Sequence, residues 1–112
     1  MKIAISCDGK NLNSKISEVF ARCPYFLIIK IEDKEVKEVK EIENKSDVQT
    51  TGAGISAAQL VAEQNIKAVI TKNIGPRAFD VLKQFNIEVY FDEGNVKESL
   101  QRFIQGKAKK IT

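Results

Sequence analysis

The spacing of apolar residues predicts strands in the first part of the chain. Residues 2–7 (KIAISC) and 25–32 are rich in isoleucine and predict two strands, the second starting after Pro24, which cannot lie inside a helix. Residues 35–44 (EVKEVKEIEN) place valine and isoleucine three apart, a spacing that fits a helix or a strand. The β-branched residues and the tight turn expected at 33–34 favour a hairpin strand.

The pattern changes after residue 52 to an alternation of helices and strands. Apolar and small residues around Ile55 and Leu60 predict a helix that ends near Asn65. A buried strand at 67–71 follows, then a helix from Pro76 to about Phe85, a strand at 87–91 and a third helix that stops near Gly106. The order β-β-β-α-β-α-β-α predicts an α/β fold with a mixed five-stranded sheet, in which strands 2–7 and 67–71 are neighbours.

Composition supports a globular chain and narrows its location. The 112 residues are 43% hydrophobic and 29% charged, with a net charge of +3, and we expect one domain at 1–106 followed by a basic tail at 107–112. The lysines of that tail are interpreted as a solvated terminus rather than a nucleic-acid contact. No apolar run approaches the ~20 residues of a membrane span, and residues 1–9 fit a strand better than a signal peptide. A cytoplasmic location is therefore expected, with no membrane partner, and nucleic-acid binding is not favoured because a base-stacking platform is lacking.

Candidate chemistry is limited by two cysteines and the lack of histidine. Ser-His-Asp and Cys-His catalysis and any histidine-based zinc site are excluded. Two cysteines cannot complete a four-ligand structural zinc site within one chain. A bound metal would have to arrive with most of its coordination filled, or be shared between chains.

Several polar residues are expected to meet at the carboxyl ends of the central strands. Cys7 and Asp8 end the first strand, and the strand at 67–71 leads to Lys72, Asn73, Gly75, Pro76 and Arg77. The loop TTGAG at 50–54 precedes a helix, and two helix N-termini there would form an electropositive crevice suited to an anion.

Each of these residues also has a purely structural interpretation. Gly52 and Gly54 can serve the loop conformation alone, with Thr50 or Thr51 as the helix cap. Asp8 can close a turn, Lys72 and Arg77 can be surface charges, and Cys7 can be a buried small residue.

Taken together, the motifs resemble one known family. FARCPYFLI at 20–28 resembles the FGR-[AC]-PYF signature of the dinitrogenase iron–molybdenum cofactor biosynthesis family, and the similarity continues through GAGISAAQLVAEQNIKAVITKNIGPRAFDVLKQFNIEV. The resemblance covers nearly the whole chain. It implies a three-layer α/β/α, ribonuclease-H-like fold with a five-stranded mixed sheet.

The resemblance also implies a non-catalytic role. Such a protein would carry an iron–sulfur or iron–molybdenum type cluster, or its precursor, as cargo between metallocluster donor and acceptor proteins. The corresponding residues in this chain are Arg22, Cys23, Thr51, Gly52, Gly54, Asn73, Gly75 and Pro76, with Cys23 and Cys7 as possible metal ligands. The chain departs from the family pattern at Ala21, where many members have glycine, and at Thr51, near which many have a histidine.

Two other functions are compatible with the residues. A regulatory or interaction module could bind a small anion or a partner protein in the same crevice. A metal-dependent phosphoryl-transfer enzyme would need converging carboxylates, for which Asp8, Asp92 and Glu93 are the candidates.

Overall fold

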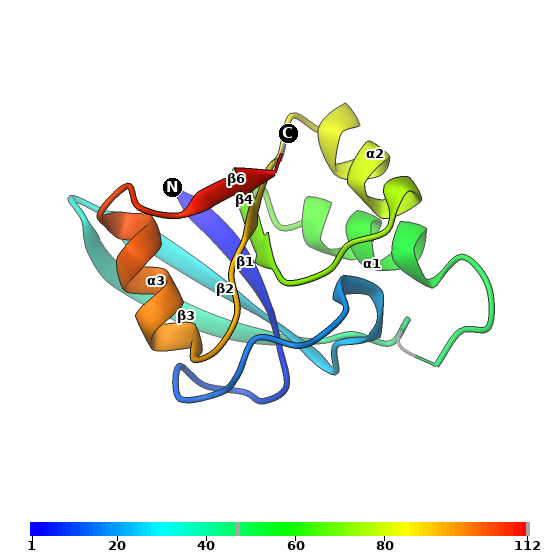
Figure 1. Cartoon of the computed structure of the whole chain (residues 1–112), viewed down its shortest axis with the longest axis horizontal. Coiled ribbons are helices and arrows are strands. Elements are labelled where there is room, and N and C mark those ends of the chain that lie inside the picture. Colours follow the sequence, from blue (N-terminus) through cyan, green and yellow to red (C-terminus); the bar gives the residue numbers. More distant parts are fainter. Residues whose placement is uncertain (47, 112) are drawn as a thin grey trace.

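A mixed six-stranded sheet forms the centre of the computed structural model, which describes residues 1–46 and 48–111 (Figure 1). The strands are β1 (Lys2–Cys7), β2 (Tyr25–Glu32), β3 (Glu35–Glu43), β4 (Ala68–Thr71), β5 (Glu88–Phe91) and β6 (Lys109–Ile111). The helices are α1 (Ala53–Ala62), α2 (Pro76–Gln84) and α3 (Val96–Ile104), with a short 3-10 helix, η1 (Phe20–Arg22), before β2. The α/β class and the predicted order of the first eight main elements are confirmed.

The sheet order is β3-β2-β1-β4-β5-β6. Strand β1 pairs antiparallel with β2 and parallel with β4, so the predicted central position of the first strand is confirmed. The predicted count of five strands is wrong, because part of the expected basic tail forms β6. After Gly106, whose φ is +76°, the chain turns back and pairs antiparallel with β5, opposite Val89. The sequence of β6, Lys-Lys-Ile, is too short to show the alternation that predicts a strand. It forms a strand because the free edge of β5 offers it backbone hydrogen bonds. Thr112 lies outside the described residues.

Helices cover both faces of the sheet, which gives three layers (Figure 1). Helices α1 and α2 pack on one face over a core that includes Phe20, Phe26, Val61 and Leu82. Helix α3 packs on the other face over a second core that includes Ile5 and Leu100. Alternate residues of β1 and β2 enter the two cores, as a strand buried on both faces requires. In the described part of the chain, every helix is too short or too polar to cross a membrane.

Residues in the left-handed backbone conformation form the tight turns between elements. The β2–β3 turn contains Asp33 at φ +53° and Lys34 at φ +63°, the paired positive angles of a two-residue hairpin loop. Asn86 follows α2 at φ +60°, a left-handed conformation that asparagine tolerates better than most residues.

Candidate functional site

A crevice of about 350 Å³ opens at the carboxyl ends of the central strands. It is lined by Val19, Phe20, Ala21, Gly52, Gly54, Ile55, Gly75, Pro76, Arg77 and Ala78. These residues come from η1 and the segment before it, from the start of α1 and from the start of α2. The structure thus brings together the two glycine-containing helix starts that the sequence predicted to meet.

Both helices begin without a side-chain cap. The N-caps are Gly52 for α1 and Gly75 for α2, and neither helix receives a capping bond from a side chain. The interpretation of Thr50 or Thr51 as the cap of α1 is therefore wrong: Gly52, at φ +72°, occupies that position with a conformation that a threonine adopts poorly. The first helical bonds are those from Ser56 N and Phe79 N to the two cap carbonyls, each 3.0 Å.

The amides ahead of these first bonds have no intrahelical acceptor. In α1 they belong to residues including Gly54 and Ile55, and in α2 to Arg77 and Ala78, all of which line the crevice. Helix amides point toward the N-terminus and carry the positive end of the helix dipole. The crevice therefore presents unpaired N–H donors and partial positive charge from two helices at once, which suits an anion.

Gly54 allows the two helices to approach closely. A Cβ placed on Gly54 would lie 3.3 Å from the Cβ of Ala78 and 3.9 Å from that of Ala21. The same test at Gly75 meets nothing within 4 Å, so Gly75 faces open space. A side chain at position 54 would therefore press on Ala78, whereas position 75 has room for one.

Asn73 organises the crevice without lining it. Its carbonyl accepts from Phe20 N at 2.8 Å, and its side-chain Nδ2 donates to the Glu18 carbonyl at 2.7 Å. These bonds tie the loop after β4 to the segment that carries η1. The predicted contact of Asn73 with a ligand stays a prediction.

The other predicted polar residues are engaged elsewhere. Lys72 forms ion pairs with Glu18 at 2.9 Å and Glu93 at 3.5 Å, and the hydrogen bond with Glu18 raises the pKa of Lys72. Arg22 donates to the Gln49 carbonyl, and Asp8 accepts from the Ser17 hydroxyl. Arg77 is the charged residue among those that line the crevice.

The two cysteines are separated by the sheet. Cys7 belongs to the core under α3 and Cys23 to the core under α1 and α2, and each is fully buried. Burial raises the pKa of Cys7 to about 11, and a backbone hydrogen bond of Gly9 opposes the shift. Cys23 lies against Asn44, whose Nδ2 is 2.8 Å from the Cys23 carbonyl and 3.8 Å from its sulfur. In this conformation the two thiols cannot approach one common ligand.

Residues 1–46 and 48–111 contain no group of three or more His, Cys, Asp or Glu side chains that could hold a metal ion. Asp92 is bound by Arg102 through two bonds of 2.9 and 3.0 Å, and Lys72 holds Glu93. The candidate carboxylates therefore do not form the cluster that metal-dependent phosphoryl transfer requires. The crevice fits an anion that already carries its own ligands better than a bare metal ion.

Several residues of the site were missed by the sequence analysis. Val19 lines the crevice, Glu18 pairs with Lys72, and the buried Asn44 side chain bonds both the Ala21 and Cys23 carbonyls. The proximity of Val19 to the FARCPYF signature could have identified it. Glu18 and Asn44 lie in polar segments without a distinguishing pattern, so no sequence signal was available.

Comparison with known proteins identifies the family of the chain and several similar proteins. The family described as Dinitrogenase iron-molybdenum cofactor matches residues 1–106. The uncharacterized protein MJ0580 of Methanocaldococcus jannaschii is 38% identical over 99% of this chain and 92% of its own length. The apo form of the orange protein from Desulfovibrio gigas has a TM-score of 0.91 at 27% identity, covering 99% of this chain and 92% of that one. A solved structure of protein MJ0327 from M. jannaschii has a TM-score of 0.81 at 35% identity, covering 100% and 95%.

Proposed function

Because the chain belongs to the dinitrogenase iron-molybdenum cofactor family, we propose that it is a non-catalytic carrier of an anionic metallocluster. The cargo is an iron–sulfur or iron–molybdenum type cluster, or a precursor of one, bound in the crevice at the starts of α1 and α2. The observation that carries this proposal is the meeting of two helix N-termini whose caps, Gly52 and Gly75, provide no side-chain oxygen.

Cluster chemistry matches what the crevice offers. A preformed cluster that keeps anionic sulfur ligands on its metal ions carries negative charge, so N–H donors can bind its surface without completing its coordination. The amides at the two helix starts supply such donors, and Arg77 adds a full positive charge. A cargo bound mainly by hydrogen bonds can be released to an acceptor protein without breaking several metal–thiolate bonds.

The cysteines have a secondary place in this proposal. Cys23 shares its core with Phe20, which forms part of the crevice wall, so a local opening of η1 would bring its thiol toward the cargo. Cys7 lies on the other side of the sheet, and its raised pKa keeps the thiol protonated at neutral pH. We therefore expect Cys23 to contribute more than Cys7 to any thiolate bond.

The decisive experiment changes Gly75, which has room for a side chain. Gly75 has φ −74° and ψ 161°, the extended geometry that capping residues adopt. Gly75→Asp places a carboxylate where it accepts from the free amides of α2 and repels an anion. Gly75→Ala is the matched control, because it adds a Cβ and leaves the amides unpaired.

Each variant is reconstituted anaerobically with iron and sulfide. The measured quantities are the charge-transfer absorption band and the iron bound per chain. We expect binding by wild type and Gly75→Ala and a loss of at least about tenfold in affinity for Gly75→Asp. Arg77→Gln should weaken binding, whereas Lys83→Gln, at the far end of the same helix, should not. Equal iron binding by the aspartate and alanine variants would refute the crevice as the binding site.

A second set of variants separates thiolate ligation from anion binding. Cys23→Ala and Cys7→Ala are reconstituted in the same way. If both bind as much iron as wild type while Gly75→Asp binds less, the cargo is held by hydrogen bonds and charge alone. If wild type binds none, the carrier proposal fails.

The same crevice supports a second candidate, a regulatory module that binds a small anion. The observation in its favour is that the donor groups of the crevice recognise negative charge and include no metal ligand among the described residues. Binding of inorganic phosphate or sulfate that is lost in Gly75→Asp, together with failure to bind iron and sulfide, would favour this function.

A further inference from the structure

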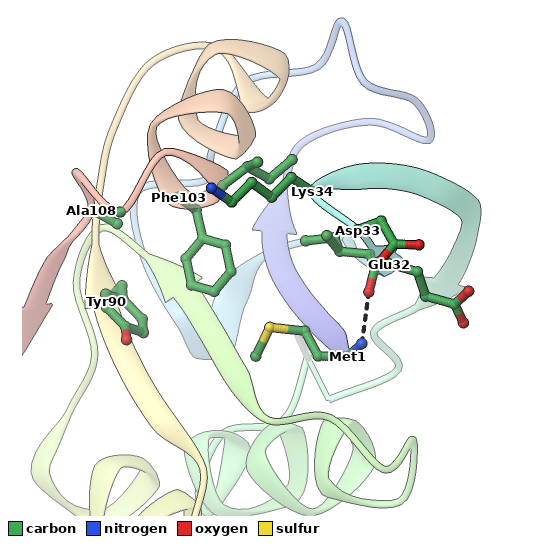
Figure 2. Close-up of a pocket in the computed structure, with 10 residues that line it drawn as sticks. Met1, Glu32, Asp33, Lys34, Tyr90, Phe103 and Ala108 are labelled. Carbon is green, nitrogen blue, oxygen red and sulfur yellow. Dashed lines mark hydrogen bonds between the residues drawn. The ribbon is translucent and has the colours of Figure 1, made fainter.

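A second cavity, larger than the crevice, lies away from it, at the amino end of β1 and on the face covered by α3. It has a volume of about 820 Å³ and is lined by Met1, Ile31, Glu32, Asp33, Lys34, Tyr90, Phe103, Ile104, Gly106 and Ala108 (Figure 2). The β2–β3 turn forms one side, and the end of α3 with the loop to β6 forms the other. The volume lies in the range of small-molecule sites.

The walls of this cavity are apolar and aromatic. Tyr90 and Phe103 meet edge to face with ring centroids 5.2 Å apart, and the Phe103 ring points into the space (Figure 2). The Met1 side chain extends into it from the opposite side, although 52% of Met1 is exposed. An exposed thioether and a ring edge around one hollow favour a flat apolar body.

The positive and negative side chains around the cavity point in different directions. The Lys34 side chain reaches across the mouth toward Phe103, whereas the carboxylates of Glu32 and Asp33 point away (Figure 2). Within residues 1–46 and 48–111, Lys34 takes part in no ion pair. The terminal ammonium of Met1 is already bonded to the Ile31 carbonyl at 2.7 Å, and the Tyr90 hydroxyl to Glu88 at 3.0 Å. Lys34 is thus the cationic side chain of the lining, and its ammonium has no ion-pair partner within residues 1–46 and 48–111.

The backbone of the turn gives separate support. Lys34 has φ +63°, in the left-handed region where a two-residue hairpin loop strongly favours glycine. Lysine at this position is strained, and its side chain is the part that extends over the cavity. A residue chosen for the turn alone would be glycine or asparagine.

We propose that this cavity binds a small organic anion with a flat apolar body. The anionic group pairs with the Lys34 ammonium, and the body packs between Met1, Phe103 and Tyr90. The site is independent of the crevice proposed for the cluster, since the two hollows share no lining residue.

Three naphthalene probes of similar shape test the sign of the charge. Naphthalene sulfonate is the anionic probe, naphthol the neutral probe and naphthylmethylamine the cationic probe. Each is titrated into the whole protein, and binding is followed by the amide chemical shifts. We expect the sulfonate to bind most tightly and to shift the amide signals of residues 31–34, Tyr90 and residues 103–108. Tighter binding of the amine, or shifts centred on another surface, would overturn the proposal.

Two variants and one control test the residues. Lys34→Gln should weaken sulfonate binding at least about threefold and leave naphthol binding unchanged. Ala108→Leu, which fills the cavity from its rim, should weaken all three probes. The control is Lys37→Gln, an exposed lysine of β3 that is paired with Glu35 at 3.0 Å. Equal sulfonate affinities for Lys34→Gln and Lys37→Gln would refute the role of Lys34. Shifts at the cavity that depend on protein concentration without probe would assign the surface to a second copy of the chain instead.

Discussion

The crevice and the cavity are built from different parts of the chain. The donors of the crevice are backbone groups: two glycine-capped helix starts present amides, and Arg77 is the charged side chain beside them. The cavity is made by side chains: Met1, Tyr90 and Phe103 form its walls and Lys34 crosses its mouth (Figure 2). Helix starts at the carboxyl ends of parallel strands follow from the α/β topology itself, so any sequence with this fold has donors there. The cavity depends on the identity of a few side chains and can be lost by single substitutions.

The two regions also treat the left-handed backbone differently. Gly52 occupies φ +72° beside the crevice, where the conformation carries no steric penalty. Lys34 occupies φ +63° beside the cavity, at an energetic penalty that a glycine would avoid. If the two hollows are separate sites, substitutions beside one should leave binding at the other intact.

The largest effect is expected from Phe20→Ala, which removes a wall of the crevice. Phe20 is fully buried and its ring lies 5.1 Å from that of Phe26, so its loss leaves a void under η1. We expect the free energy of unfolding to fall by about 3–5 kcal/mol. Denaturant unfolding measures this. Phe85→Ala serves as the control, because Phe85 is 57% exposed and its loss should change stability by less than about 0.5 kcal/mol.

If the variant remains folded, naphthalene sulfonate should still bind at the cavity while iron and sulfide binding is lost. Loss of both together, in protein that is shown to be folded, would mean that the two hollows are coupled.

The next effect concerns the core under α3 and depends on pH. Cys7 has a pKa of about 11 in the folded protein, against an ordinary value of 9.0, because burial disfavours the thiolate. A thiol whose pKa is raised by folding contributes stability that is fully present below the unfolded pKa. This contribution is lost as the pH rises toward the folded pKa. Stability should therefore decline between about pH 9 and 11, by up to about 2–3 kcal/mol from this group.

Denaturant unfolding across this range should show a smaller decline for Cys7→Ala than for wild type. Cys23→Ala is the comparison on the other face of the sheet. Identical slopes for wild type and Cys7→Ala would contradict the assignment of this pH dependence to Cys7.

Gly52→Ala tests the backbone of the crevice. A Cβ at Gly52 has open space, with nothing within 4 Å, so the penalty comes from φ +72° alone. We expect a loss of about 1–2 kcal/mol in stability. The matched control is Gly75→Ala, whose φ of −74° is open to all residues and which should change stability by less than about 0.5 kcal/mol. Thermal unfolding of both variants decides whether conformation, rather than space, requires glycine at 52.

The smallest effect has the opposite sign. Lys34→Gly relieves the left-handed strain of the β2–β3 turn, offset by the greater freedom of glycine in the unfolded chain. We expect a gain of roughly 0.5 kcal/mol in stability together with weaker binding of naphthalene sulfonate. A stabilised variant that binds the probe as well as wild type would separate the turn from the cavity and remove the functional reason for lysine.

Much of the fold could be predicted because its signals are local. The isoleucine-rich first two strands, the Gly75-Pro76 helix start and the Asn86 turn each depend on preferences within a few residues. The meeting of the α1 and α2 starts also followed from the sequence, since element order fixes which ends of the strands they occupy. Family membership followed from the same motifs.

Some predictions failed where the outcome depended on distant partners. Lys72 was expected among the residues that meet at the crevice, but it does not line the crevice, and Glu18 and Glu93 hold it in ion pairs. The basic tail was expected to add no strand, but residues 109–111 pair with β5 to form β6, while Lys109 and Lys110 stay exposed. Neither partner is recognisable from the sequence around the residue concerned.

The sequence by itself determined the class of fold, the order of its main elements and the family. Tertiary structure alone decided that Cys7 and Cys23 lie on opposite faces of the sheet, and that Met1, Lys34 and Phe103 enclose one cavity. Local propensities act over a few residues and can be read along the chain. Strand register and helix packing set which distant side chains meet, and they are fixed only when both faces of the sheet are covered together.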